Sequence, residues 1–166
     1  MKEEISPEEL GSLLFSCAAR WASRDVETLA FLDSVRANTL DMDYFTKELI
    51  IVIMDAAMNV VLSKIKAEEK ALRVLDSMNN AFVNRWNPED RHKIQVYIEM
   101  RYNEYEDVQS EKRGPNQLWP LSHPILKNLL GKEAIGETPR DAVTLTSIAA
   151  YYSGRLIAFD EVVRNL

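Results

Sequence analysis

The stretch that most constrains this chain is residues 49–65, LIIVIMDAAMNVVLSKI, because it is the most apolar run in the sequence. On a helical wheel its apolar side chains cover most of the circumference, and the polar residues fall on one narrow stripe. That stripe consists of Glu48, Asp55, Asn59 and Lys66. A helix that is apolar on most sides is usually packed by neighbours on most sides. Asp55 and Asn59 interrupt the run too strongly for a membrane span. We therefore predict a central helix over about 43–66.

The size and composition of the chain fit one domain. With 166 residues and 46% hydrophobic content, the sequence can bury an ordinary core without metals or disulfides. Cys17 is the only cysteine, so no internal disulfide can form. The predicted fold is a single all-α domain over 1–166, a bundle of six or seven helices around the central one.

Capping signals divide the chain into helices. Ser6 before Pro7 and two glutamates is a helix start, and Ser23 is predicted to start a second, shorter helix that fades near Arg36. Asp41 or Asp43 should cap the central helix. Later starts are predicted at Asn87, Pro124 and Thr138, with helices ending near Ser110, Leu130 and the carboxyl terminus.

Residues 43–86 contain no glycine or proline, so the sequence leaves two alternatives open. One is a single helix of unusual length. The other, which base rates favour, is two helices that join near Ala67.

The charge of the chain limits its partners. The net charge is −6, which argues against nucleic-acid binding and against binding to an anionic membrane. The acidic amino terminus lacks the apolar segment of a signal peptide, so we expect a cytoplasmic protein. Five glycines form no phosphate-binding loop, and one cysteine with two histidines makes a structural zinc site improbable. We therefore predict no cofactor, no metal and no catalytic residue.

One acidic pattern offers an enzymatic alternative. Residues 104–107, Glu-Tyr-Glu-Asp, resemble half of the magnesium-binding motif of all-α nucleotide pyrophosphatases. In that family the pair faces a Glu-Glu-x-x-Glu segment, and here Glu68 and Glu69 are followed by Leu72 at the third position. The resemblance implies a magnesium-dependent enzyme. The sequence departs from the family's motif at one ligand position. The other interpretation is a solvated acidic helix end.

Arg101 lies within an apolar stripe that includes Tyr97 and Tyr105, and a guanidinium there must be paired or reach water. The sequence allows an interhelical salt bridge, extension to the surface, or a pocket for a small anionic or aromatic ligand. That pocket would use Arg101, Tyr97, Tyr102, Tyr105 and Asp55. The stripe with Asp55 is expected to face solvent or a polar seam. If it faces inward, an Asp55–Arg101 pair would satisfy both groups.

Two further features suggest contacts with another protein chain. Ala150 and Gly154 belong to a small-residue face of the last helix, which would serve close packing within the chain or a twofold dimer seam. Trp119 and Leu121 lie in a predicted loop over 112–123, which would cap the bundle or offer an exposed anchor.

Three classes of function follow. The first is a non-enzymatic interaction or regulatory module, with a homodimer as one form and a protein as the expected partner. The second is a binder of a small anionic or aromatic ligand near Arg101. The third is the magnesium-dependent enzyme.

Overall fold

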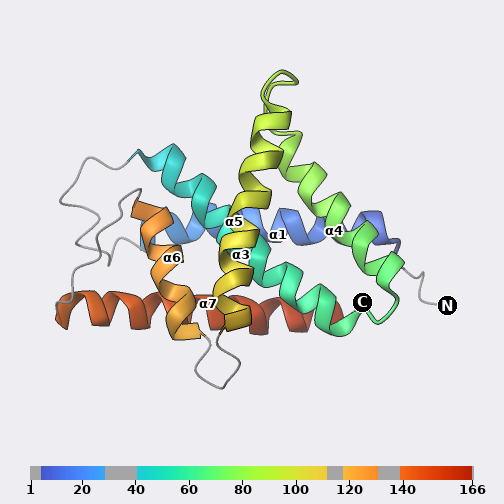
Figure 1. Ribbon diagram of the computed structural model, residues 1–166. Coiled ribbons are helices and arrows are strands. Elements are labelled where there is room, and N and C mark those ends of the chain that lie inside the picture. Colours follow the sequence, from blue (N-terminus) through green and yellow to red (C-terminus); the bar gives the residue numbers. More distant parts are fainter. Residues whose placement is uncertain (1–4, 29–40, 112–117, 131–138, 166) are drawn as a thin grey trace.

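The computed structural model describes residues 5–28, 41–111, 118–130 and 139–165 (Figure 1). This part of the chain forms six helices and no strand, which confirms the predicted all-α bundle. The helices are α1 (Pro7–Thr28), α3 (Met42–Lys64), α4 (Glu68–Val83), α5 (Arg91–Glu111), α6 (Leu118–Leu130) and α7 (Pro139–Arg164).

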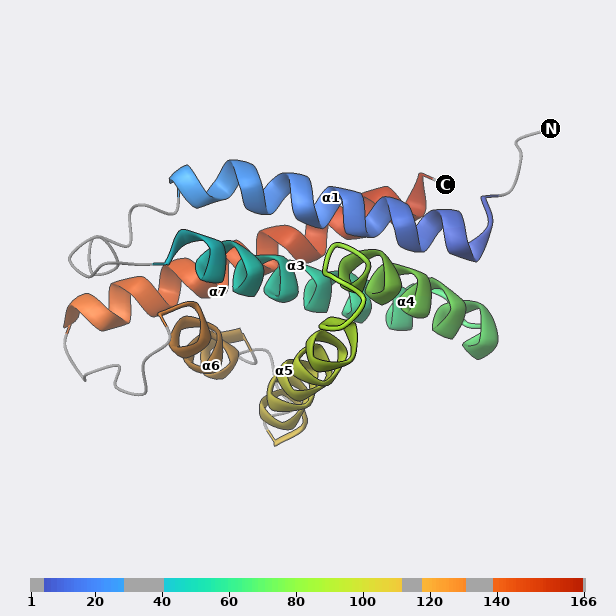
Figure 2. The ribbon, with the colours of Figure 1, turned by 90° about the horizontal axis from the view of Figure 1, so that it is seen from above.

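The apolar helix α3 is the centre of the bundle, as its sequence predicts. It contacts each of the other five described helices. Figure 2 shows α1 on one side of α3 and helices α5 and α6 on the other, with α7 running beside it. Among the described residues, no helix has the combination of length and apolarity that is needed to cross a bilayer.

Several predicted helix ends are confirmed. Ser6 and Glu9 form a capping box, in which the Ser6 amide donates to the Glu9 carboxylate and the Glu9 amide donates to Ser6 Oγ. Asp41 caps α3 by accepting from two first-turn amides. The stretch 43–86 is two helices, because α3 ends at Lys64 and Ala67 is the N-cap of α4.

The predicted helix starts at Ser23 and Asn87 are wrong. Helix α1 continues through Ser23 to Thr28, because Ser23 Oγ bonds the Ala19 carbonyl inside the helix and does not cap a new one. The remainder of that predicted second helix lies outside the described residues. Helix α5 begins at Arg91 after a turn over 88–90, where the Asp90 carbonyl accepts the first helical bond. Thr138 is not among the described residues.

Helix α6 begins at Leu118, six residues before the predicted start at Pro124. Pro120 falls in its first turn, where a missing amide costs nothing, and Pro124 is accommodated inside the helix. Trp119 and Leu121 therefore lie on a helix and not in a loop.

Helices α1 and α4 approach each other closely at Gly11, a position that the sequence analysis did not identify. A Cβ atom built on Gly11 would lie 2.3 Å from the Val74 carbonyl oxygen of α4 and 2.7 Å from Ser77 Cβ. Glycine is thus required where α1 crosses α4. Gly154, which was expected to allow such an approach, is exposed, and an added Cβ would meet nothing within 4 Å.

Candidate functional site

Two carboxylates of the central helix are buried. Glu48 is 0% exposed and Asp55 is 1% exposed, and they lie two helical turns apart on one side of α3. Of the two predicted alternatives, solvent or a polar seam, solvent is wrong for both residues, because each faces polar side chains of a neighbouring helix. Lys66 at the end of the stripe is exposed. A buried carboxylate is tolerated only with hydrogen-bond or ionic partners, so the partners define what this region can do.

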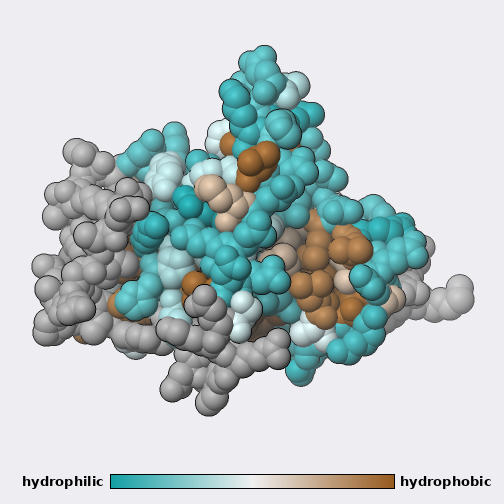
Figure 3. All heavy atoms as spheres, in the orientation of Figure 1, coloured by the Kyte–Doolittle hydropathy of each residue, from teal (hydrophilic) through white to brown (hydrophobic). Residues whose placement is uncertain are grey.

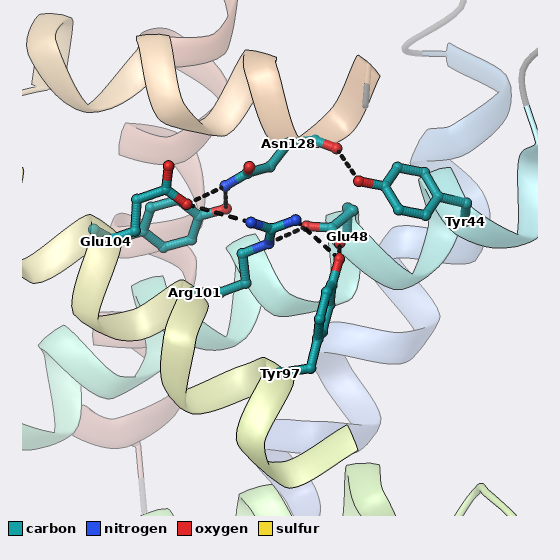
Figure 4. A network of polar contacts seen from close by, with 7 residues as sticks. Tyr44, Glu48, Tyr97, Arg101, Glu104 and Asn128 are labelled. Carbon is teal, nitrogen blue, oxygen red and sulfur yellow. Dashed lines mark hydrogen bonds and ion pairs between the residues drawn. The ribbon is translucent and has the colours of Figure 1, made fainter. Parts of the chain in front are cut away.

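Glu48 is held by α5 (Figure 4). Arg101 Nε lies 3.1 Å from Glu48 Oε2, and Arg101 Nη1 lies 3.4 Å from Glu104 Oε2. The Tyr97 hydroxyl donates to Glu48 Oε1 and accepts from Arg101 Nη2 at 3.0 Å. The guanidinium thus sits between two carboxylates and a phenol.

Helix α6 closes this network from a third direction. Asn128 Nδ2 donates to Glu104 Oε2 at 2.9 Å and to the Tyr105 hydroxyl at 3.3 Å. The Asn128 backbone carbonyl accepts from the Tyr44 hydroxyl of α3 at 2.8 Å (Figure 4). Asn128 is buried, and its bonds connect the polar groups of α3, α5 and α6 into one unit.

The electrostatics favour a charged Arg101. Burial by itself would lower the pKa of Arg101, but the adjacent Glu48 carboxylate outweighs this and raises it. Burial raises the pKa of Glu48, and the Arg101 guanidinium acts in the opposite direction. Arg101 is only 13% exposed in its side chain and engages Glu48, Glu104 and Tyr97. The arrangement is that of an interhelical ion pair in which each guanidinium nitrogen already donates a hydrogen bond within the protein.

The predicted Asp55–Arg101 pair is wrong, because Arg101 bonds Glu48 and Asp55 has other partners. Asp55 Oδ2 accepts from the Tyr152 hydroxyl of α7 at 2.5 Å. Asn59 Nδ2 lies 3.3 Å and Gln109 Nε2 3.5 Å from the same oxygen. These partners carry no charge, and burial raises the pKa of Asp55 to about 7.

The remaining residues of the predicted ligand pocket do not converge on Arg101. Tyr102 is buried and donates to Asn79 Oδ1 of α4 at 3.1 Å, away from the network. Tyr105 is buried against Asn128, and burial raises its pKa. Tyr97 alone contacts the guanidinium directly.

A second ion pair, between α1 and α7, was missed. Asp25 is buried and lies 3.0 Å from Arg155 Nη2, and it accepts from the Tyr151 hydroxyl at 2.9 Å. The Arg155 guanidinium lies over the rings of Trp21 and Tyr151, 5.0 and 4.8 Å from their centroids. The sequence does indicate a cation that needs a partner here, because Arg155 lies within the apolar pattern of the last helix. Arg101 lies in the same way within the apolar stripe of α5.

The residues predicted to contact another protein differ in their exposure. Leu121 is 1% exposed and belongs to the core, so it cannot be an exposed anchor. The Trp119 side chain lies outside the described part. Ala150 and Gly154 are exposed on α7, which contradicts their use in close packing within the chain.

The described residues contain no metal-type cluster of three or more histidine, cysteine, aspartate or glutamate side chains. Glu104 is engaged by Arg101 and Asn128. Glu68 and Glu69, the acids expected opposite it, are exposed on α4. The magnesium alternative therefore has no assembled site in this part of the structure.

Comparisons of this chain with protein-family models, curated proteins and solved structures found no significant match.

Proposed function

We propose that this protein is a non-enzymatic interaction module that associates with a second copy of itself through the outer side of α5. The observation that carries the proposal is a second apolar stripe on that helix. The inward side of α5 carries Ile98, Tyr102 and Tyr105, all buried. On the outer side, Val96 and Met100 are 50% and 51% exposed.

A surface helix ordinarily has one apolar stripe facing the core and a polar face toward water. Val96 and Met100 are spaced by one helical turn, so their side chains neighbour each other. Figure 3 shows hydrophobic atoms on α5, with a larger hydrophobic patch beside it over α3 and α4. Helix α5 also rises away from the body of the bundle (Figure 1), which leaves room for a partner helix.

The charges at the two ends of this outer stripe are complementary to each other. Lys93 lies two turns before Met100 and Asp107 two turns after it, and both are exposed. If a twofold axis passes beside Met100, two α5 helices run antiparallel and Lys93 of one copy faces Asp107 of the other. Isologous pairing of this kind is the commonest form of homodimer.

The small apolar area supports a weak, reversible dimer, because stable interfaces bury much more surface. Lys93 contacts Asp90 of its own chain at 3.5 Å, but its side chain is 79% exposed and can reorient at little cost.

Sedimentation equilibrium over a range of concentrations tests the proposal. We expect a monomer–dimer equilibrium that Met100→Glu abolishes. Val143→Glu on α7 is the matched control, since Val143 is also strongly exposed, and it should leave the equilibrium unchanged. A monomer up to about 1 mM, where a free energy of about −4 kcal/mol suffices for association, would refute the proposal. So would a Met100→Glu variant that dimerises like the wild type.

The small-residue face of α7 is the competing dimer seam. Gly154→Leu would abolish association through that seam and leave association through α5 intact, so the same measurement separates the two surfaces.

A further inference from the structure

A hollow of about 430 Å³ lies where α3 passes into α4, against the carboxyl-terminal end of α7. In Figure 1 this joint is beside the end of the chain marked C. The volume is within the range of small-molecule sites. The floor of the hollow is apolar and is formed by Ile5, Leu10, Ile65 and Val163.

The rim of the hollow is basic, although the chain as a whole carries a net charge of −6. Four cationic side chains line it, and none of the described lining residues is acidic. The four are Lys64, Lys66, Lys70 and Arg164. Such a rim concentrates positive potential over an apolar surface.

Asp160, a described carboxylate beside the hollow, neutralises only part of the charge of Lys64 and Arg164. Asp160 lies 2.8 Å from Lys64 Nζ and 2.7 Å from Arg164 Nη2, so one negative charge serves two cations. Lys66 Nζ donates to the Ser63 carbonyl at 2.8 Å, which is an uncharged acceptor. Lys64, Lys66 and Arg164 together with Asp160 therefore leave positive charge at the mouth of the hollow within the described part of the chain.

The start of α4 also favours an anion in the hollow. Ala67 lines the hollow and is the N-cap of α4, where it offers no side-chain hydrogen bond to the first amides. Alanine is a poor N-cap, and amides at a helix start favour an anion. The acids of the first turn, Glu68 and Glu69, do not line this hollow.

We propose that the hollow at the α3–α4 joint binds one molecule of an amphipathic anion, an alkyl chain that ends in a phosphate, sulfate or carboxylate. The anionic group lies among the lysines and the alkyl chain covers the apolar floor. This site is separate from the outer side of α5, so its failure leaves the proposed dimer untouched.

Calorimetric titration with alkyl phosphates below their micelle-forming concentrations tests whether binding needs both the anionic group and the alkyl chain. From butyl to octyl phosphate we expect affinity to rise by about threefold to fourfold for each methylene that becomes buried. Inorganic phosphate and octanol should each bind much more weakly than octyl phosphate. Octanol binding as tightly as octyl phosphate, or an affinity independent of chain length, would overturn the proposal.

A charge reversal locates the anion. Lys66→Glu should weaken octyl phosphate binding by about tenfold or more, because an attraction becomes a repulsion. The control is Arg20→Glu on α1, which changes the net charge equally at an exposed position outside this hollow and should leave the affinity within about twofold. Thermal melts of both variants check that they remain folded. Equal affinities of the wild type and Lys66→Glu would contradict the site.

Amide chemical-shift changes on titration complete the test. We expect them at residues 64–70 and at the end of α7, and changes confined elsewhere would overturn the assignment. A membrane surface is the other source of alkyl anions. Binding to vesicles of phosphatidylcholine with one quarter phosphatidylglycerol, without binding of monomeric octyl phosphate, would replace the proposed pocket with a surface contact.

Discussion

Arg101 of α5 lies 3.1 Å from Glu48 of the central helix, and this pair joins two helices that otherwise meet sparsely. The Glu48 side chain is completely buried, and the Arg101 side chain is 13% exposed. Desolvation of two charges is expensive, and the ion pair with its added hydrogen bonds offsets that cost. We therefore expect the pair to fix the position of α5 on α3 more than it adds to the stability of the fold.

The first prediction concerns the loss of one partner. Arg101→Met leaves the Glu48 carboxylate buried without its cation, and we expect the free energy of unfolding to fall by about 3–5 kcal/mol. Glu48→Met should have a cost of similar size for the converse reason. Urea denaturation of each variant measures these losses.

The double variant Glu48→Met/Arg101→Met measures the coupling free energy between the two residues. It should be more stable than the sum of the two losses implies, because neither charge is then left alone. Small, additive losses would contradict a buried ion pair.

The second prediction concerns pH. The pKa of Asp55 is raised by burial to about 7, well above that of an unfolded aspartate near 4. Between these values the folded state binds more protons, so the contribution of Asp55 to stability decreases as pH rises from about 4 to 7. Asp55→Asn removes this titration and can still accept from Tyr152.

We therefore expect Asp55→Asn to be more stable than the wild type at pH 8, and the difference to shrink toward pH 4. Denaturation at several pH values gives the difference curve, in which shared groups such as Glu48 cancel. A difference independent of pH would show that Asp55 does not titrate in this range.

The third prediction contrasts two helical glycines. Gly11→Ala should destabilise the fold by about 1–3 kcal/mol, because the new methyl overlaps the backbone of α4. Gly154→Ala should stabilise it by about 1 kcal/mol, because the position is open and alanine favours a helix. Thermal melts compare the two, and the same sign of effect at both positions would refute this assignment.

Much of the fold could be predicted from periodicity and capping. The apolar run around Ile53 indicates the central helix, and Ser6 and Asp41 mark helix starts through local chemistry that needs no tertiary information. Ser23 misled because the same hydroxyl that caps a helix can also bond a carbonyl within one. Local sequence does not decide between these two uses.

The polar site was predicted only in part, since pairing depends on how helices are aligned. The apolar neighbours of Arg101 indicated a guanidinium that must be paired or reach water, and the interhelical salt bridge was one of three alternatives. Glu48 and Asp55 occupy the same stripe of α3 two turns apart, so the sequence cannot tell which of them pairs with Arg101 of α5. The close approach at Gly11 depends on α4, which is distant in the sequence.

The fourth prediction concerns the charges at the ends of the outer stripe of α5. In the antiparallel dimer each Lys93 faces an Asp107 of the other copy. Lys93→Asp alone therefore places an acid opposite an acid at both ends of the interface. Asp107→Lys alone places a lysine opposite a lysine at both ends. Each variant should therefore dimerise more weakly than the wild type, by roughly 1 kcal/mol or more, at low salt.

The most direct measurement is sedimentation equilibrium of an equimolar mixture of the Lys93→Asp and Asp107→Lys variants. In the mixed dimer both contacts are again between opposite charges. The antiparallel α5 pairing predicts that the mixture associates more tightly than either variant alone and approaches the wild type. A mixture that associates no better than its components would contradict that pairing.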